Sequence, residues 1–161
     1  MLQTANVARE IEGVQTDVLL QAFADRILVL VTQLGKVGSL IQATVPSTMP
    51  LLPAPPPDPE QPNVVPLPVP PPSLQLTPLL GSAPTERIQT LHSLYASHIS
   101  TLVWTMEEDS VMEADRRAVV VGIALAKAPG TVADSSSELS PHDRRVFYGV
   151  MEMLRDLLAQ K

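Results

Sequence analysis

The sequence predicts an α+β domain in which a mainly antiparallel sheet carries two helices. Three observations lead to this prediction. Several short apolar stretches are rich in β-branched residues, two longer stretches place apolar residues at helical spacing, and a run of prolines separates the first strands from the rest. In chain order the pattern is three strands, an insert, a strand, a helix, a strand and a helix. We expect both helices on one face of the sheet, within a single domain spanning residues 1–161.

The first three strands are expected upstream of residue 45. The first alternates imperfectly between apolar and polar residues, and the second is almost continuously apolar, which is typical of a strand buried on both faces. A turn with two glycines, Leu34–Gly38, separates the second from the third. Because the links are short, we expect an antiparallel meander. The expected strands are Val14–Ala22, Arg26–Gln33 and Ser39–Thr44.

The insert is defined by proline. Fourteen of the 17 prolines lie between Pro46 and Pro78. Proline has no N–H for a β-ladder and biases the preceding residue toward extended backbone. The segment from about 46 to 73 also has no Lys or Arg. We therefore expect a disordered, polyproline-II-like loop that interrupts one domain rather than a folded part of the core.

The second half alternates strands and helices. Pro78 limits the strand at Leu74–Leu80 to an edge or an end of the sheet. Pro84 suits the first turn of a helix expected to run to about Glu107. Ser140 followed by proline is a helix start signal, and an apolar stripe continues from it to the C-terminus. The strand between the helices, Ala118–Ala126, is the most apolar of the chain.

Composition excludes several functions. The net charge of −6 and a pI near 4.9 argue against general affinity for nucleic acid or anionic membrane. The absence of cysteine excludes disulfides, thiolate zinc sites and cysteine nucleophiles. No signal peptide is expected at the start, and no apolar run approaches the roughly 20 residues that span a bilayer. We expect a soluble protein of the cytoplasm, and also of the nucleus.

The templates for catalysis and cofactor binding fail. His92 and His98 are six residues apart on one expected helix and cannot share a metal as an i, i+4 pair can. The Gly35-Lys36 pair lacks the Ser or Thr that follows the lysine of a phosphate loop, and no helix follows it. No nucleophile elbow or calcium-loop pattern occurs. We expect no enzyme activity, cofactor or metal, although an enzyme of another class stays an alternative.

Two segments are candidates for binding a protein partner. One is the turn that carries Gly35 and Lys36. The other is the acidic stretch that begins with Glu107, Glu108 and Asp109, which suits a basic partner surface, although a solvated acidic loop is the simpler interpretation. The proline-rich segment contains Pro-x-x-Pro patterns but no neighbouring basic residue, so we favour a passive linker over a docking motif.

The stretch Ala22–Leu40 resembles the proteasome assembly chaperone 3 family. The resemblance lies in Ala22-Phe23, then Ile-Leu-Val-Leu-Val-Thr-Gln at residues 27–33, then Gly-Lys-x-Gly at residues 35–38. The Leu79-Leu-Gly81 junction before a helix and the Ala118–Ala126 strand before a last helix are weaker similarities. The resemblance covers most of the chain outside the insert. The insert is longer and richer in proline than is expected for the family, as in a fungal-type member with a proline-rich loop.

The resemblance implies a small α+β fold that binds proteins without catalysis or cofactor. It implies a dimer, usually a heterodimer with a proteasome assembly chaperone 4-like partner, and a homodimer when alone. It further implies that the dimer helps alpha-type subunits to form the ring of the proteasome core particle. The alternative is a non-catalytic dimeric α+β scaffold of another intracellular complex. We expect the sheet to form the dimer contact, with the insert as a bystander.

Overall fold

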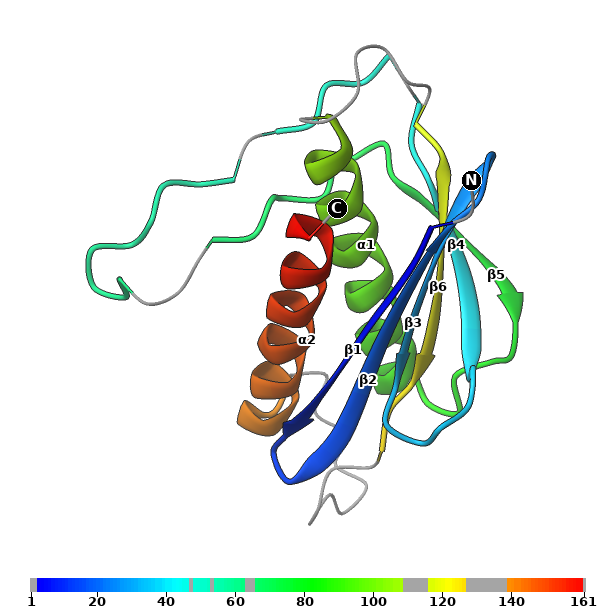
Figure 1. Cartoon of the computed structure of the whole chain (residues 1–161), viewed down its shortest axis with the longest axis vertical. Coiled ribbons are helices and arrows are strands. Elements are labelled where there is room, and N and C mark those ends of the chain that lie inside the picture. Colours follow the sequence, from blue (N-terminus) through cyan, green and yellow to red (C-terminus); the bar gives the residue numbers. More distant parts are fainter. Residues whose placement is uncertain are drawn as a thin grey trace.

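The computed structural model describes residues 3–46, 48–52, 54–62, 66–108, 116–126 and 139–160, which form one mixed sheet with two helices (Figure 1). The sheet order is β1-β2-β3-β6-β4-β5, and all neighbouring pairs except β3–β6 are antiparallel. The predicted α+β class is confirmed. The elements are β1 (Gln3–Ile11), β2 (Val14–Ala22), β3 (Arg26–Thr32), β4 (Ser39–Thr44), β5 (Gln75–Leu80), α1 (Glu86–Glu108), β6 (Ala118–Ala124) and α2 (Pro141–Ala159).

The first strand, β1, is absent from the predicted element order. It pairs with β2 in a hairpin whose two turn residues, Glu12 and Gly13, have φ values of +52° and +77°. Positive φ at both positions is typical of the tight turns that join antiparallel strands. The sequence signal was weak because the apolar positions of β1 that face the helices include the small Ala5 beside Val7. The element order therefore begins with four strands rather than three.

The predicted meander of the first strands is wrong at its third member. β6 lies between β3 and β4, parallel to β3 and antiparallel to β4. β6 is the strand with the most buried side chains, so it occupies the middle of the sheet, where both neighbours cover it. The turn after β3 therefore passes over the end of β6. This distance is only two strand spacings, or about 10 Å, which the six-residue link can cover.

Both helices lie on the same side of the sheet, and the core lies between them and the strands (Figure 1). Alternate residues of the strands point into it, as the period of two requires. Trp104 closes one end of the core, and its indole N–H donates to the Arg117 carbonyl at 2.8 Å. The other fully buried residues of this inner face include Leu20, Ile27, Val29, Val31, Val119 and Val121 from the strands and Tyr95, Ile99, Val150 and Leu154 from the helices.

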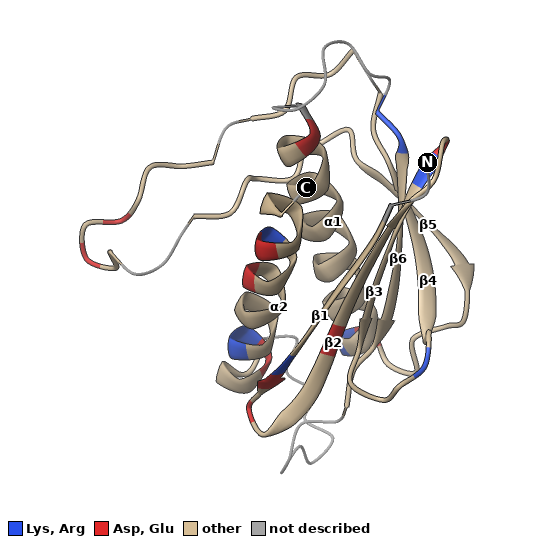
Figure 2. Cartoon of the chain, viewed as in Figure 1, with Lys and Arg blue, Asp and Glu red and all other residues tan. Residues whose placement is uncertain are grey.

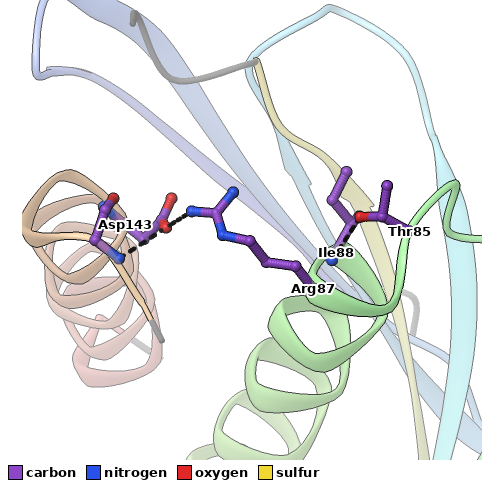
Figure 3. Close-up of polar contacts among 5 residues, drawn as sticks. Thr85, Arg87, Ile88 and Asp143 are labelled. Carbon is purple, nitrogen blue, oxygen red and sulfur yellow. Dashed lines mark hydrogen bonds and ion pairs between the residues drawn. The ribbon is translucent and has the colours of Figure 1, made fainter. Parts of the chain in front are cut away.

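The N-termini of the two helices are tied together. Thr85 caps α1, since its Oγ1 accepts from the Ile88 N–H at 3.2 Å, so Pro84 precedes the cap rather than opening the helix (Figure 3). Ser140 caps α2 as predicted, in a capping box with Asp143. The Asp143 carboxylate also forms an ion pair with Arg87 of α1 (Figure 3). One carboxylate thus caps α2 and holds the two helices in register.

The proline-rich insert runs out on the helix side of the sheet (Figure 1). The ends of the insert contact the folded domain formed by the sheet and the helices. Arg116, at the start of β6, donates to the Pro46 carbonyl at 2.9 Å. Pro68 and Pro71 are buried, and Leu67 packs against the core. Residues 54–62 are exposed throughout. The described parts of the insert therefore lie on the same side of the sheet as the helices.

Candidate interaction surface

The sheet face opposite the helices, here called the outer face, carries a band of aliphatic side chains. They alternate in sequence with the core residues, so they point away from both helices. All but one are only half-buried. The outer face is defined by Leu19 of β2, Leu28 and Leu30 of β3, Val120 of β6 and Leu40 of β4.

The strand register aligns these residues into a row across the sheet. Leu19 pairs with Leu30, Leu30 with Gly122, and Gly122 with Leu40. On the far side of β4, Leu40 pairs with Leu80 of the edge strand. Five neighbouring strands thus contribute to one apolar row. Such a row is the usual form of an apolar patch on one face of a sheet.

Gly122 lies at the middle of the row. Because it has no side chain, Leu30 and Leu40 on either side can pack over it. A Cβ atom at this position would lie 2.4 Å from Leu30 Cδ2 and 3.1 Å from Leu40 Cδ2. It would also lie 3.2 Å from the Val37 carbonyl oxygen. The turn after β3 therefore folds across the outer face here. The glycine keeps the surface flat and the leucines close together.

Polar residues frame the apolar band on the outer face. Asp17 and Gln21 of β2 lie on this face beside Leu19, and Gln42 and Thr44 of β4 lie beside Leu40. An apolar centre with a polar rim is the usual anatomy of a protein interface. The apolar centre of the outer face holds no titratable side chain.

One end of the outer face is the most exposed apolar part. Leu34 and Val37 in the turn after β3 are 51% and 44% exposed. Leu79 and Leu80 at the end of β5 are 48% and 60% exposed, and Gly81 after them packs against Ser39 at the start of β4. These four side chains, here called the apolar tip, belong to the same end of the sheet. Large exposed aliphatic groups gathered at one place mark interaction sites.

Hydrogen bonds within the chain account for most of the specific motif at residues 32–38. Thr32 Oγ1 accepts from the Leu34 N–H at 3.2 Å and the Lys36 N–H at 3.1 Å. The Gln33 amide donates to Thr16 Oγ1 at 3.1 Å, and its oxygen accepts from the Ala126 N–H at 3.0 Å. Thr32 and Gln33 therefore build the turn and fasten it to β2 and β6. The side chains that they leave outside are those of residues 34, 36 and 37.

The two glycines of the turn serve different purposes. Both have φ near +69°, a region that residues with a side chain rarely adopt. A Cβ at Gly35 would meet nothing within 4 Å, whereas a Cβ at Gly38 would lie 2.1 Å from the Ile123 carbonyl oxygen. Gly38 is thus the point where the link passes over the end of β6. Gly35, predicted as a binding residue, is required by the backbone of the turn itself.

The two predicted binding segments lie at opposite ends of the sheet (Figure 2). Lys36 follows the C-terminal end of β3. Glu107 lies in the last turn of α1 and forms an ion pair with Arg117, which also donates to the Phe23 carbonyl at 2.7 Å near the start of β3. Glu107 is thus part of α1 rather than of a loop. Glu108 ends the same helix, and Asp109 lies outside the described residues.

His92 and His98 join no metal site among the described residues. In the parts of the chain that the structure describes, no group of three His, Asp or Glu side chains is placed to hold a metal. His92 lines an open cleft of about 400 Å³ between α1 and β4–β5, and burial lowers its pKa. His98 packs edge-on to Phe147, and burial lowers its pKa as well. Neither forms a hydrogen bond or ion pair with a described carboxylate. The third histidine, His142, lies 3.9 Å from Glu12, whose carboxylate also pairs with Arg145 at 2.7 Å.

The described part of the chain also has no membrane-crossing element. Neither α1 nor α2 combines the length with the hydropathy that a bilayer-spanning helix requires.

The outer face was not predicted residue by residue. Arg26–Gln33 reads as a strand buried on both faces, but only its inner face is covered by helices, and Leu28 and Leu30 stay half-exposed. The signal was present in the sequence. A continuously apolar strand requires two covering layers, and the two helices expected from the sequence suffice for one face.

Comparisons with known proteins found similarity among solved structures and none among sequences. No protein-family model matches the sequence, and no curated protein matches it. Among solved structures, the fold is similar to a chain of a structure described as a novel chaperone complex for yeast 20S proteasome assembly. The alignment covers 97% of this chain and 98% of the other, with a TM-score of 0.49 and 10% sequence identity.

Proposed function

We propose that this protein is a non-catalytic proteasome assembly chaperone that works as a dimer formed through the outer face of its sheet. The observation that carries the proposal is the half-exposed aliphatic row that runs through Leu19, Leu30 and Leu40 on the face opposite the helices. Burying such a face against a second apolar face stabilises the complex by about 25 cal/mol for each Å² of apolar surface removed from water. The occupant that we propose is a related domain with its own open sheet.

The proposed partner is a proteasome assembly chaperone 4-like protein, and a second copy of this chain replaces it when the protein is alone. Two facing sheets pack about 10 Å apart, with the helices of each domain on the outside. The apolar centre of the outer face contains no charge, so the pairing leaves no unpaired charge buried. The polar rim of Asp17, Gln21 and Gln42 would stay at the border of such a contact.

The proteasome role rests on the resemblance of Ala22–Leu40 to the chaperone family. Within that stretch the structure explains Thr32, Gln33 and Gly38 by the turn that they build. Lys36 contributes only its backbone N–H to the turn, and its side chain is exposed. We propose that the turn around Lys36 and the acidic segment from Glu107 contact alpha-type subunits, while the outer face holds the partner chaperone. The protein would act in the cytoplasm and nucleus.

The test is native purification of the tagged full chain with identification of what accompanies it. We expect a second small chaperone and alpha-type proteasome subunits. The variant Leu30→Asp, which places a charge in the aliphatic row, should lose the chaperone. Leu52→Asp in the insert, where the leucine is already 51% exposed, is the matched control and should keep it. Recovery of a different complex by both the parent chain and Leu52→Asp would instead support a scaffold of another assembly.

The proposed alpha-subunit contacts need separate variants. Lys36→Ala should weaken the recovery of alpha-type subunits without changing the melting temperature, because the Lys36 side chain is exposed. Charge reversal at Glu107 is a poor test, since it also removes the ion pair with Arg117. Glu108→Lys and Asp109→Lys test the acidic segment while Glu107 itself stays in place. Unchanged recovery in all three variants would remove these contacts from the proposal.

A further inference from the structure

The two edges of the sheet differ in how well they are protected. β5 is six residues long, carries Pro78 and has a register irregularity between Leu40 and Ile41 of its neighbour. Proline and irregular register are devices that keep other strands from pairing with an edge. β1 has neither device. It is nine residues long and pairs with β2 without a break from Gln3 to Ile11.

The hairpin geometry shows which backbone groups of β1 are free. Ile11 and Val14 flank a two-residue turn, so they form a hydrogen-bonded pair, and the pairs alternate from there. The backbone groups of Arg9, Val7 and Ala5 therefore point to β2. Those of Glu10, Ala8, Asn6 and Thr4 point outward, and no backbone hydrogen bond to another described residue uses them. A row of four donors and acceptors is thus open along the edge.

The side chains along β1 leave this row accessible. Thr4, Asn6 and Ala8 are short and exposed. The one cation of the strand, Arg9, turns to the helix side, where it lies 3.3 Å from Glu152 and 3.3 Å from Asp156 of α2. It is therefore held away from the edge, where a charged side chain would discourage pairing.

The surroundings of the edge indicate the chemistry of an incoming strand. On the helix side, Ala5 and Val7 pack against the core and present an apolar surface beside the edge. Around them, Glu10 is exposed, and Glu152 and Asp156, which both pair with Arg9, have side chains that are 65% and 53% exposed. The other nearby cation, Arg145, pairs with Glu12 at the hairpin turn. An added strand with small or β-branched side chains on its helix-facing side, and with a Lys or Arg, complements both features.

We propose that the free edge of β1 binds an extended, basic segment of a partner protein by adding it to the sheet as a further strand. Backbone hydrogen bonds to Thr4, Asn6, Ala8 and Glu10 supply the attachment, and the acidic surroundings select the charge. This site is separate from the outer face, because edge pairing uses the backbone in the plane of the sheet. A dimer through the outer face leaves the edge open.

The experiment measures amide hydrogen exchange of the ¹⁵N-labelled full chain with and without a probe peptide. The probe is a capped nine-residue peptide of alternating valine and threonine with a lysine at each end. At saturating peptide we expect exchange at Asn6 and Ala8 to slow at least about tenfold, with little change along β5. A peptide with glutamate in place of both lysines should bind more weakly.

Two substitutions at one position supply the control. Asn6→Pro removes an outward N–H but no bond to β2, whereas Asn6→Thr keeps the N–H. We expect the proline variant to lose peptide protection and the threonine variant to keep it, at similar melting temperatures. Three results would overturn the proposal. The peptide could protect amides of β5 instead of β1, it could bind Asn6→Pro as well as the parent chain, or it could protect no amide at all.

Two further outcomes separate this proposal from others. Leu30→Asp, which should break the proposed dimer, should still bind the peptide at β1, so the two proposals can fail independently. Concentration-dependent protection of Asn6 and Ala8 without peptide, lost in Asn6→Pro, would mean that a second copy of this chain occupies the edge. That result would overturn the assignment to a basic partner segment.

Discussion

The two faces of the sheet carry the same kind of side chain but have different surroundings. On the inner face, Leu20, Val29 and Val121 are 0% exposed because two helices cover them. On the outer face, Leu19, Leu28 and Leu30 occupy the neighbouring positions and stay half-buried. Aliphatic residues on a face that the fold does not need to cover suggest that another molecule covers it. The difference shows that counting only the residues buried within one chain would miss the apolar side chains of the outer face.

The largest expected effect compares two adjacent leucines on opposite faces. Leu20→Ala should lower the free energy of unfolding by about 2–5 kcal/mol, because it leaves a cavity among fully buried neighbours. Leu19→Ala should lower it by less than about 1 kcal/mol in the separated chain, since Leu19 is already half-exposed. Urea unfolding at low protein concentration measures both. Equal losses would show that the outer face is as important to the monomer as the core.

The turn that folds across the outer face gives the next comparison. Gly38→Ala should cost about 2–4 kcal/mol, because an alanine combines an unfavourable φ with overlap against the Ile123 carbonyl. Gly35→Ala has the same φ but open space, so only about 1 kcal/mol is expected. Thermal unfolding of the two variants provides the measurement. If Gly38→Ala is as stable as Gly35→Ala, the link does not pass closely over β6.

Two leucines of the proline-rich insert allow a similar comparison between a packed and an exposed side chain on the helix side of the sheet. Leu67→Ala should lower stability by about 1 kcal/mol, because Leu67 packs against the core. Leu52→Ala should change it by less than about 0.5 kcal/mol, since Leu52 is 51% exposed. Neither should affect partner binding at the outer face. Loss of the partner in either variant would show that the insert takes part in the contact.

The smallest expected effect is a dependence of stability on pH. Burial lowers the pKa of both His92 and His98 in the folded chain below the ordinary value of 6.5. The unfolded chain therefore binds more protons just below pH 6.5, and stability should fall as the pH drops from 7 toward 5.5. The double variant His92→Gln, His98→Gln should flatten that part of the curve. A curve that is unchanged in the double variant would assign the pH dependence to other groups.

Much of the fold was predictable because the relevant signals are local. The period of two in β2, the Ser140-Pro141 start of α2 and the proline limit on β5 each depend on neighbours in sequence. The place of β6 was not predictable in this way. Its insertion between β3 and β4 depends on which strand gains most from being central, and this is decided by contacts between residues 76 to 92 positions apart.

The candidate surface was predictable only in outline. The sequence located the Lys36 turn, but the register that lines up Leu19, Leu30 and Leu40 depends on the order of the strands. The pairing of Glu107 with Arg117 depends likewise on how α1 ends beside β6. A charge pattern in sequence cannot show whether a carboxylate already has a partner within the chain.

The most direct test of the account is sedimentation of the natively purified chain and its Leu30→Asp variant. We predict that the parent chain sediments as a dimeric complex and that Leu30→Asp sediments at the mass of one chain while keeping its circular dichroism spectrum. Leu52→Asp should behave as the parent. A folded Leu30→Asp variant that still sediments as the same complex would contradict the claim that the outer face is the interface.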